Sequence, residues 1–159
     1  MKEVNKSKKT DLFQEYLYQV HNIDRMTLED RFGVPNKAVY GDTVTADISR
    51  KKAARLLKAN PEFKRWAQDV YNINKQLRNK LVEGGLITQE VASLWEKMYP
   101  HYVPITRVDK IGLNVNVPLD TNKTGVNNPV KKATGGNSDI EPLFNTMAQR
   151  IEQTYRAIA

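Results

Sequence analysis

The residues best suited to chemistry are a run of lysines and arginines that no acidic residue interrupts. Residues 50–58 hold five cations and no carboxylate, at spacings that place several of them along one side of a helix. Lysine and arginine bind phosphate oxygens, and such contacts attach a protein to a nucleic-acid backbone without reading bases. The predicted contact residues in this run are Arg50, Lys51, Lys52, Arg55 and Lys58. A solvated helix face carries the same pattern, so the run indicates a surface and not a defined activity.

Two further basic stretches could extend this surface. Residues 1–9 have four lysines against one glutamate, and residues 106–137 have five basic residues against two aspartates. In the second stretch, Lys123, Lys131 and Lys132 are predicted to follow the first contact as an arm. The net charge of +7 favours a polyanionic or acidic partner. No convincing helix-turn-helix pattern accompanies these cations, so we expect contacts that tolerate different base sequences.

Residues that could support catalysis are few. Neither His21 nor His101 has a metal-binding partner four residues away, and the absence of cysteine excludes thiolate nucleophiles and Cys-based metal sites. We interpret His101, at the end of a predicted helix, as a structural residue. Four early aspartates could gather around a divalent cation, as metal-dependent nucleases require, although their spacing matches no known metal-binding loop. These aspartates are Asp24, Asp30, Asp42 and Asp47.

Two other features have simpler structural explanations. Gly135-Gly136 lacks the preceding strand and the following Lys-Ser/Thr of a phosphate-binding loop, so we interpret the pair as a hinge before a helix. Four aromatic side chains could stack on bases: Phe63, Trp66, Tyr71 and Trp95. Trp66 and Trp95 lie on the apolar faces of predicted helices, which favours core packing for both.

Helices are predicted for most of the first hundred residues. Thr10 is expected to cap a helix that begins at the next residue, and a second helix over 46–59 carries the basic run. Asn60-Pro61 should start a third helix, because asparagine caps helices and proline suits their first position. That helix should end at Gly84-Gly85 and form an antiparallel hairpin with a shorter helix over 88–98.

The character of the chain changes after Pro100. Apolar residues that alternate with glycine and asparagine predict a β-ribbon, and they are Ile111, Leu113, Val115 and Val117. Residues 119–137 are rich in Asn, Thr, Gly and Lys and predict a mobile loop. A capping box over 138–141 should open a last helix. No stop signal ends this helix, so the chain could be an independent protein or a piece of a longer one.

The predicted fold is therefore mainly α, with about five helices around a central helical hairpin, a short β-ribbon and a long polar loop. A helical core over 10–105 follows a basic, flexible N-terminus of residues 1–9. The ribbon and mobile loop cover residues 106–137, and a C-terminal helix over 138–159 packs on the core.

The composition is that of an ordinary globular domain. Hydrophobic residues make up 40% and charged residues 27% of the 159 positions, which argues against a disordered chain. There is no run of about 18 apolar residues that would predict a transmembrane helix. No apolar segment follows the basic N-terminus, so no secretory signal is expected. The lack of cysteine fits a reducing cytoplasm.

Three segments of the chain have a distinctive sequence. They are residues 21–26 (HNIDRM), residues 84–95 with 98–104 (GGLITQEVASLW and MYPHYVP), and residues 137–144 (NSDIEPLF). Together they resemble a helical segment found inside large polyvalent proteins of bacteriophages and conjugative elements. The resemblance covers most of residues 10–159 and implies a role in a long protein that enters a host with the element's DNA and protects or establishes it. It brings no catalytic motif.

These observations lead to one main hypothesis and two alternatives. We expect a non-enzymatic binding module of a phage or mobile genetic element, without a cofactor, that contacts nucleic acid or a nucleic-acid-bound complex. The first alternative is an inhibitor of a host defence nuclease such as a CRISPR effector, in the manner of an anti-CRISPR protein, that uses the same basic face. The second is a metal-dependent nuclease. The expected location is the cytoplasm of a bacterial host, with delivery alongside phage or plasmid DNA as one route and no membrane contact.

Overall fold

Six helices make up the described part of the chain in the computed structural model, which describes residues 2–36, 38–39, 44–105 and 142–159. They are α1 (Lys2–Met26), α2 (Leu28–Phe32), α3 (Ala46–Ala59), α4 (Phe63–Glu83), α5 (Gln89–Met98) and α6 (Leu143–Ile158). The mainly α class is confirmed, and these residues contain no strand. The predicted ribbon over 111–117, the loop after it and the capping box over 138–141 lie outside the described residues.

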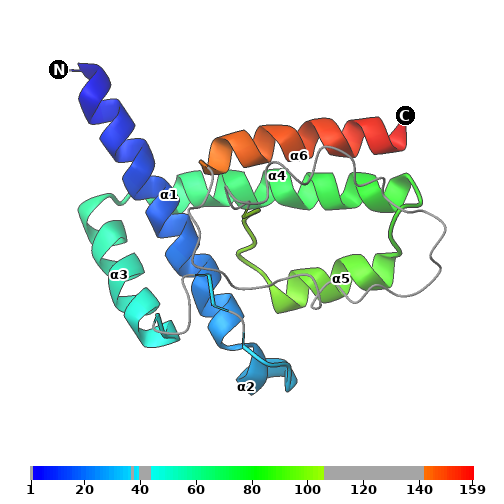
Figure 1. Ribbon diagram of the computed structural model, residues 1–159, viewed down its shortest axis with the longest axis horizontal. Helices are drawn as coiled ribbons and strands as arrows, with labels where there is room; N and C mark the ends of the chain where they lie inside the picture. The colour runs from blue at the N-terminus through cyan, green and yellow to red at the C-terminus, as the bar shows by residue number, and fades with distance from the viewer. Residues whose placement is uncertain (1, 37, 40–43, 106–141) are drawn as a thin grey trace, which may run out of the picture.

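The helices form two groups, α1 to α3 and α4 to α6, which meet along one apolar core. Figure 1 shows α1 crossing the molecule at a steep angle, with α3 against it, while α6 runs alongside α4 and α5 lies on the other side of α4. Ser49 and Ala53 are the buried residues of α3, and their small side chains allow α3 to pack closely on α1. No described helix is both long enough and apolar enough to cross a membrane.

The core is built from apolar positions that recur every three or four residues. On α4 the buried residues are Phe63, Ala67 and Val70, and α1 and α6 place their own apolar residues against them. The Phe13 ring lies 5.2 Å from the Phe63 ring and 5.4 Å from the Trp66 ring, between ring centroids. Trp66 therefore packs against the core, as predicted.

Several predicted helix ends are confirmed. The structure places α3 over the predicted range, and α5 begins after Thr88, whose hydroxyl accepts a hydrogen bond from the Val91 N–H at 3.2 Å. The last turn of α4 is closed by Gly84 and Gly85, and Gly85 has a φ of +70°, which favours glycine. Local signals were sufficient at these positions because each cap is made within a few residues of sequence.

Two predicted helix starts are wrong. The first helix begins at Lys2 and not after Thr10, so residues 2–10 belong to α1. These residues include no proline or glycine, and a helix already held by packing extends readily through them. The Asn60 side chain donates to the Leu56 carbonyl at 3.1 Å, so it ends α3 and does not cap α4. Residues 60–62 form a turn, and α4 begins at Phe63.

Candidate nucleic-acid interface

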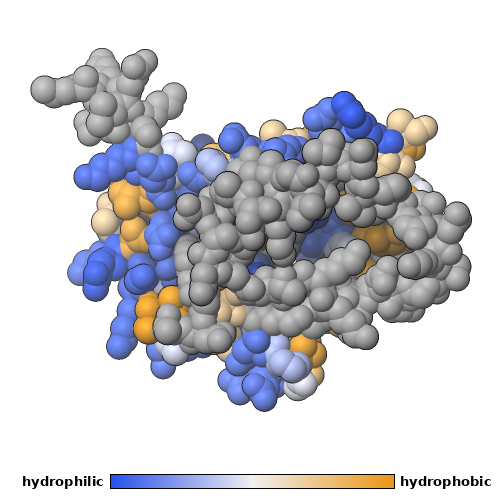
Figure 2. Space-filling view, viewed as in Figure 1, coloured by the Kyte–Doolittle hydropathy of each residue, from blue (hydrophilic) through white to orange (hydrophobic). Residues whose placement is uncertain are grey.

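The cations of α3 lie on the side opposite its packing face. Ser49 and Ala53 are buried and Leu56 is half-buried, which turns that side of the helix toward the core. All five predicted contact residues of this helix are exposed: Arg50, Lys51, Lys52, Arg55 and Lys58. Hydrophilic side chains accordingly project from the edge of the molecule formed by α3 in Figure 2. Helical periodicity thus converts one sequence run into an exposed basic surface.

Among the described residues, one of these cations has an ion-pair partner and four have none. The Arg50 guanidinium lies 2.6 Å from a carboxylate oxygen of Asp47, one turn earlier on the same helix. The other four form no ion pair with any residue in the described part of the chain; they are Lys51, Lys52, Arg55 and Lys58, called the α3 basic face below. An exposed pair such as the first is worth little energetically, so Arg50 can exchange its partner at low cost.

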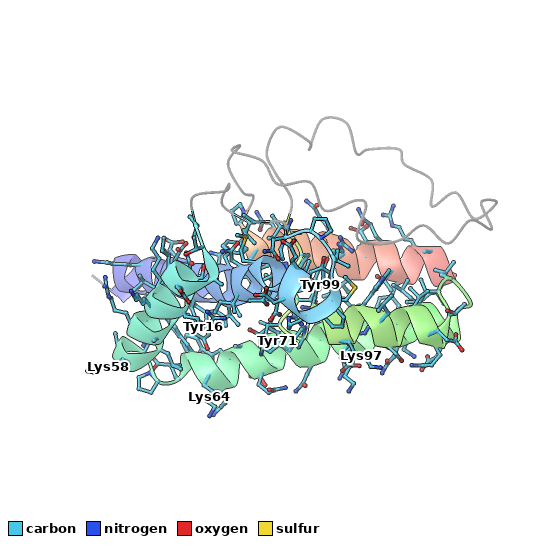
Figure 3. All side chains as sticks on the ribbon, turned by 90° about the horizontal axis from the view of Figure 1, so that it is seen from below. Tyr16, Lys58, Lys64, Tyr71, Lys97 and Tyr99 are labelled. Atoms are coloured by element: carbon cyan, nitrogen blue, oxygen red, sulfur yellow. The ribbon has the colours of Figure 1, made fainter. Side chains whose placement is uncertain are left out.

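Two further cations follow this face along the chain at the start of α4, and the sequence interpretation missed them. Lys64 and Arg65 are exposed and have no ion-pair partner among the described residues. Figure 3 shows Lys58 at the end of α3 and Lys64 near the start of α4. Lys9 is different, because it pairs with the Glu62 carboxylate and lies over the Trp66 ring. The adjacent cations Lys64 and Arg65, three and four residues after Pro61, are the signal that could have revealed this extension.

The structure does not test the predicted arm. Lys123, Lys131 and Lys132 lie outside the described residues.

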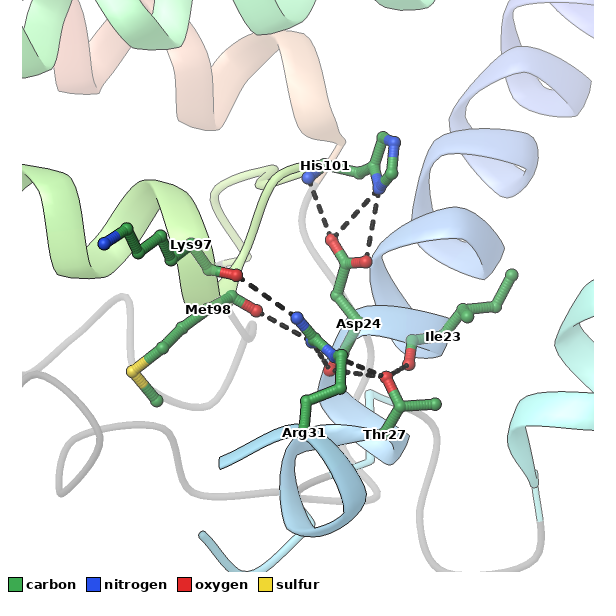
Figure 4. A network of polar contacts seen from close by, with 7 residues as sticks. All are labelled: Ile23, Asp24, Thr27, Arg31, Lys97, Met98 and His101. Carbon is green, nitrogen blue, oxygen red and sulfur yellow. Dashed lines mark hydrogen bonds and ion pairs between the residues drawn. The ribbon is translucent and has the colours of Figure 1, made fainter. Parts of the chain in front are cut away.

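A polar network joins the end of α1 to the turn after α5 (Figure 4). The buried Asp24 carboxylate accepts a hydrogen bond from the His101 backbone N–H at 2.8 Å and lies 3.2 Å from His101 Nδ1. The Arg31 guanidinium donates to the Asp24 carbonyl at 2.7 Å and to the Met98 carbonyl at 2.9 Å. These bonds agree with the interpretation of His101 as a structural residue. They also bring Asp24 and His101 together across 77 positions of sequence.

The two histidines have opposite electrostatic environments. Hydrogen bonding to the Asp24 carboxylate raises the pKa of His101. Burial, together with the smaller effect of the nearby Arg25 cation, lowers the pKa of His21 to about 3. The His21 ring is packed between Tyr99 and Tyr102, with ring centroids 5.8 Å and 5.6 Å away. His21 is therefore a neutral core residue at physiological pH.

A cleft of about 410 Å³ opens beside this network, between α1, α4 and the turn after α5. Four tyrosines line it, so it is called the tyrosine cleft below: Tyr16, Tyr71, Tyr99 and Tyr102. Its cations are Lys64, Lys75 and Arg78, and Glu96 lies 3.3 Å from Lys75 and 3.6 Å from Arg78. His101 completes the lining and meets the Tyr71 ring edge-on, with centroids 5.3 Å apart. Three cations against one lining carboxylate leave the cleft positively charged.

The hydroxyls of Tyr71 and Tyr99 are the unusual groups of this cleft. Both oxygens are buried and have no hydrogen-bond partner in the described part of the chain. Burial raises the pKa of both phenols, so each stays a neutral O–H donor. Both oxygens are closed off from solvent, so the two tyrosines face the cleft with their rings and not with their hydroxyls.

The four aspartates considered for metal binding do not gather in the described residues. Asp24 faces His101, Asp47 pairs with Arg50, Asp30 is exposed on α2, and Asp42 lies outside the described residues. Within the described ranges no three metal-ligating side chains lie close enough to hold one ion. The candidate functional groups of the described part of the chain are therefore its exposed cations and its cleft.

Comparison with known proteins assigns the chain to no family. No protein-family model, no curated protein and no solved structure matches the chain. The function is therefore argued from the charges and contacts described above.

Proposed function

We propose that this chain is a non-enzymatic module of a phage or mobile genetic element, which acts in the cytoplasm of a bacterial host. It binds the phosphate backbone of nucleic acid, either free or within a nucleoprotein complex. One observation carries the proposal: the α3 basic face presents four exposed cations, with no ion-pair partner in the described residues, opposite the packing side of the helix. Such a face is free to exchange water and counterions for phosphate oxygens.

The dimensions of α3 suit this task. Lys51 and Lys58 are seven residues apart, which is about 10 Å along a helix axis. Successive phosphates of one strand advance by about 3.4 Å along a duplex axis, so the face spans about three such steps, or about four phosphates. Contacts of this kind fix position and orientation and do not select bases. The expected binding is therefore tolerant of sequence and strongly dependent on salt.

A second candidate is direct inhibition of a host defence nuclease. Ile48 is 40% exposed and lies one helical turn before Lys51 and Lys52, within the basic surface. An apolar side chain among cations gains more from an acidic protein surface than from a phosphate backbone. In this case the same face binds the acidic or RNA-bearing surface of the nuclease. Weak binding of free nucleic acid together with a stable complex with a purified effector nuclease would favour this candidate.

A pair of charge-matched variants tests the main proposal. Lys51→Glu/Arg55→Glu and Lys97→Glu/Arg150→Glu each lower the net charge by four, and all four residues are exposed. Fluorescence anisotropy with a labelled oligonucleotide should show affinity reduced at least tenfold for the α3 variant. The control variant should lose much less. Equal losses in both variants would mean that net charge alone drives binding, and absence of binding by the wild-type protein would remove the proposal.

A further inference from the structure

The tyrosine cleft has the size and chemistry of a small-ligand site. Its volume of about 410 Å³ lies in the lower part of the range found for sites that enclose small molecules. Figure 3 shows Tyr16, Tyr71 and Tyr99 close together between α1 and α4, so aromatic surface forms part of its wall. Tyrosine rings stack on nucleobases of any identity, because every base has a π-face.

Polar groups stand beside these rings. The hydroxyls of Tyr71 and Tyr99 are enclosed, so the polar groups that a ligand can reach lie at the rim of the cleft. At the exposed rim, the Gln68 amide donates to the Asn72 side-chain oxygen at 3.1 Å, which leaves their remaining amide donors and acceptors available to a base edge. A heterocycle with ring nitrogens and carbonyl oxygens could hydrogen-bond to these rim amides while it stacks on the tyrosine rings.

The charges of the cleft favour an anion next to that heterocycle. Lys64 is exposed, Lys75 is paired with Glu96, and the Arg78 side chain is only 13% exposed. Glu96 neutralises part of this charge, while Lys64 has no carboxylate partner in the described ranges. A phosphate at the mouth could therefore reach Lys64 first. A base joined to a phosphate is a nucleotide, which matches both parts of the cleft.

Lys64 also connects the cleft with the α3 basic face. It lines the cleft and follows Lys58, the last cation of α3, by six positions across the turn between α3 and α4. A backbone held along α3 can therefore continue past Lys64 to the cleft mouth. Bases in a duplex are stacked and paired, and only an unstacked base can enter such a cleft.

We infer that the tyrosine cleft holds one unstacked nucleotide of a single-stranded nucleic acid whose neighbouring phosphates lie on the α3 basic face. This inference rests on the proposed function and makes it more specific. The substrate class becomes single-stranded RNA or DNA, bound by backbone charge and by one stacked base. Selectivity for single strands over duplexes then comes from the cleft and not from α3.

Filling the cleft without changing charge tests the inference. Gln68→Trp places a bulky side chain at the rim, and Gln76→Trp is a matched control, because Gln76 is an exposed residue of the same helix that does not line the cleft. Binding of labelled 12-residue oligouridine and oligodeoxythymidine, and of a duplex of equal length, is measured by anisotropy. We expect Gln68→Trp to weaken binding of one or both single strands about tenfold and to leave duplex binding unchanged. Gln76→Trp should match the wild-type protein on all three probes.

The outcomes separate the inference from the proposed function. If Gln68→Trp binds both single strands like the wild-type protein, while Lys51→Glu/Arg55→Glu loses binding, the cleft inference is overturned and the α3 proposal stands. Equal weakening of single-strand and duplex binding by Gln68→Trp also overturns the inference. If the wild-type protein binds none of the three probes, both the inference and the direct nucleic-acid proposal fail. Circular dichroism confirms that the two tryptophan variants are folded.

Discussion

The α3 basic face and the tyrosine cleft are both basic, but they are built differently. The α3 basic face comes from one continuous segment, and all four of its cations are exposed. The cleft is assembled from α1, α4, α5 and the turn after α5, and its cation Arg78 and its tyrosines are partly or fully withdrawn from solvent. A change of charge on the α3 basic face therefore costs little folding stability. Groups in the cleft are held in place by contacts from distant segments.

This difference has a consequence for mutagenesis. Substitutions on an exposed helix face change affinity and leave stability nearly unchanged, because surface charges contribute little to folding. Substitutions around the cleft change stability first, because buried hydrogen bonds join its walls. The two regions can therefore be separated by measuring unfolding and binding on the same variants.

Removal of the Asp24 carboxylate should have the largest effect. Asp24→Ala removes the acceptor for the His101 N–H and the charge that faces its imidazole, so we expect a loss of about 3 kcal/mol in the free energy of unfolding. Asp30→Ala is the matched control, because Asp30 is exposed and should change stability by less than about 0.5 kcal/mol. Urea denaturation followed by circular dichroism measures both. Equal stability of the two variants would show that the network does not hold the cleft together.

Acidification should have the next largest effect, through His21. The unfolded chain binds a proton at this residue with a pKa near 6.5, whereas burial lowers the pKa in the folded protein to about 3. Stability is complete above the unfolded value and falls as pH decreases below it, by about 2–3 kcal/mol on reaching a pH of about 4.5. His101 has the opposite sign, because its raised pKa favours the protonated folded form and its contribution disappears as pH rises.

A variant that cannot titrate isolates the His21 contribution. His21→Gln should be less stable than the wild-type protein at neutral pH and should lose less stability between about pH 6.5 and 4.5. Urea midpoints measured across this range give the comparison. A decline in the variant as steep as that of the wild-type protein would assign the acid sensitivity to other groups.

Loss of the hydrogen bonds between α3 and α1 should have a smaller effect on stability. The buried Ser49 hydroxyl donates to Gln19 Oε1 at 2.7 Å and accepts from Asn22 Nδ2 at 2.9 Å. Ser49→Ala leaves both amides without this partner, and we expect a loss of about 1–2 kcal/mol in the free energy of unfolding. Ser93→Ala serves as the control, because the hydrogen bond that Ser93 accepts from Gln89 is exposed. Nucleic-acid affinity of Ser49→Ala at low temperature should remain that of the wild-type protein.

The sequence predicted what is local and missed what depends on distant contacts. The range of α3, the Thr88 cap and the exposure of Lys51 and Lys58 follow from spacing within a few residues. The Asp24–His101 contact joins positions 77 apart, and no periodicity within one helix could reveal it. The role of Asn60 was mistaken for a similar reason. An asparagine between two helices can end one or start the next, and tertiary packing decides which.

The smallest expected effect concerns the salt dependence of binding. If each cation of the α3 basic face neutralises one phosphate, Lys51→Gln should reduce the slope of log affinity against log salt concentration by about 0.7 on a single strand. Lys97→Gln removes the same charge from α5, a helix outside the α3 basic face, and its slope should equal that of the wild-type protein. Titrations at four salt concentrations with one single-stranded oligonucleotide give both slopes.

The slope distinguishes a phosphate contact from a general effect of charge. A cation that only contributes to the long-range field changes affinity at low salt, and ions of the medium screen it within about 10 Å at 0.1 M. A cation in contact with a phosphate changes the number of counterions released, and that change appears in the slope. Unchanged slopes for Lys51→Gln and for Lys58→Gln would therefore place the nucleic acid elsewhere on the protein. A reduced slope for Lys64→Gln as well would extend the backbone path from α3 to the mouth of the tyrosine cleft.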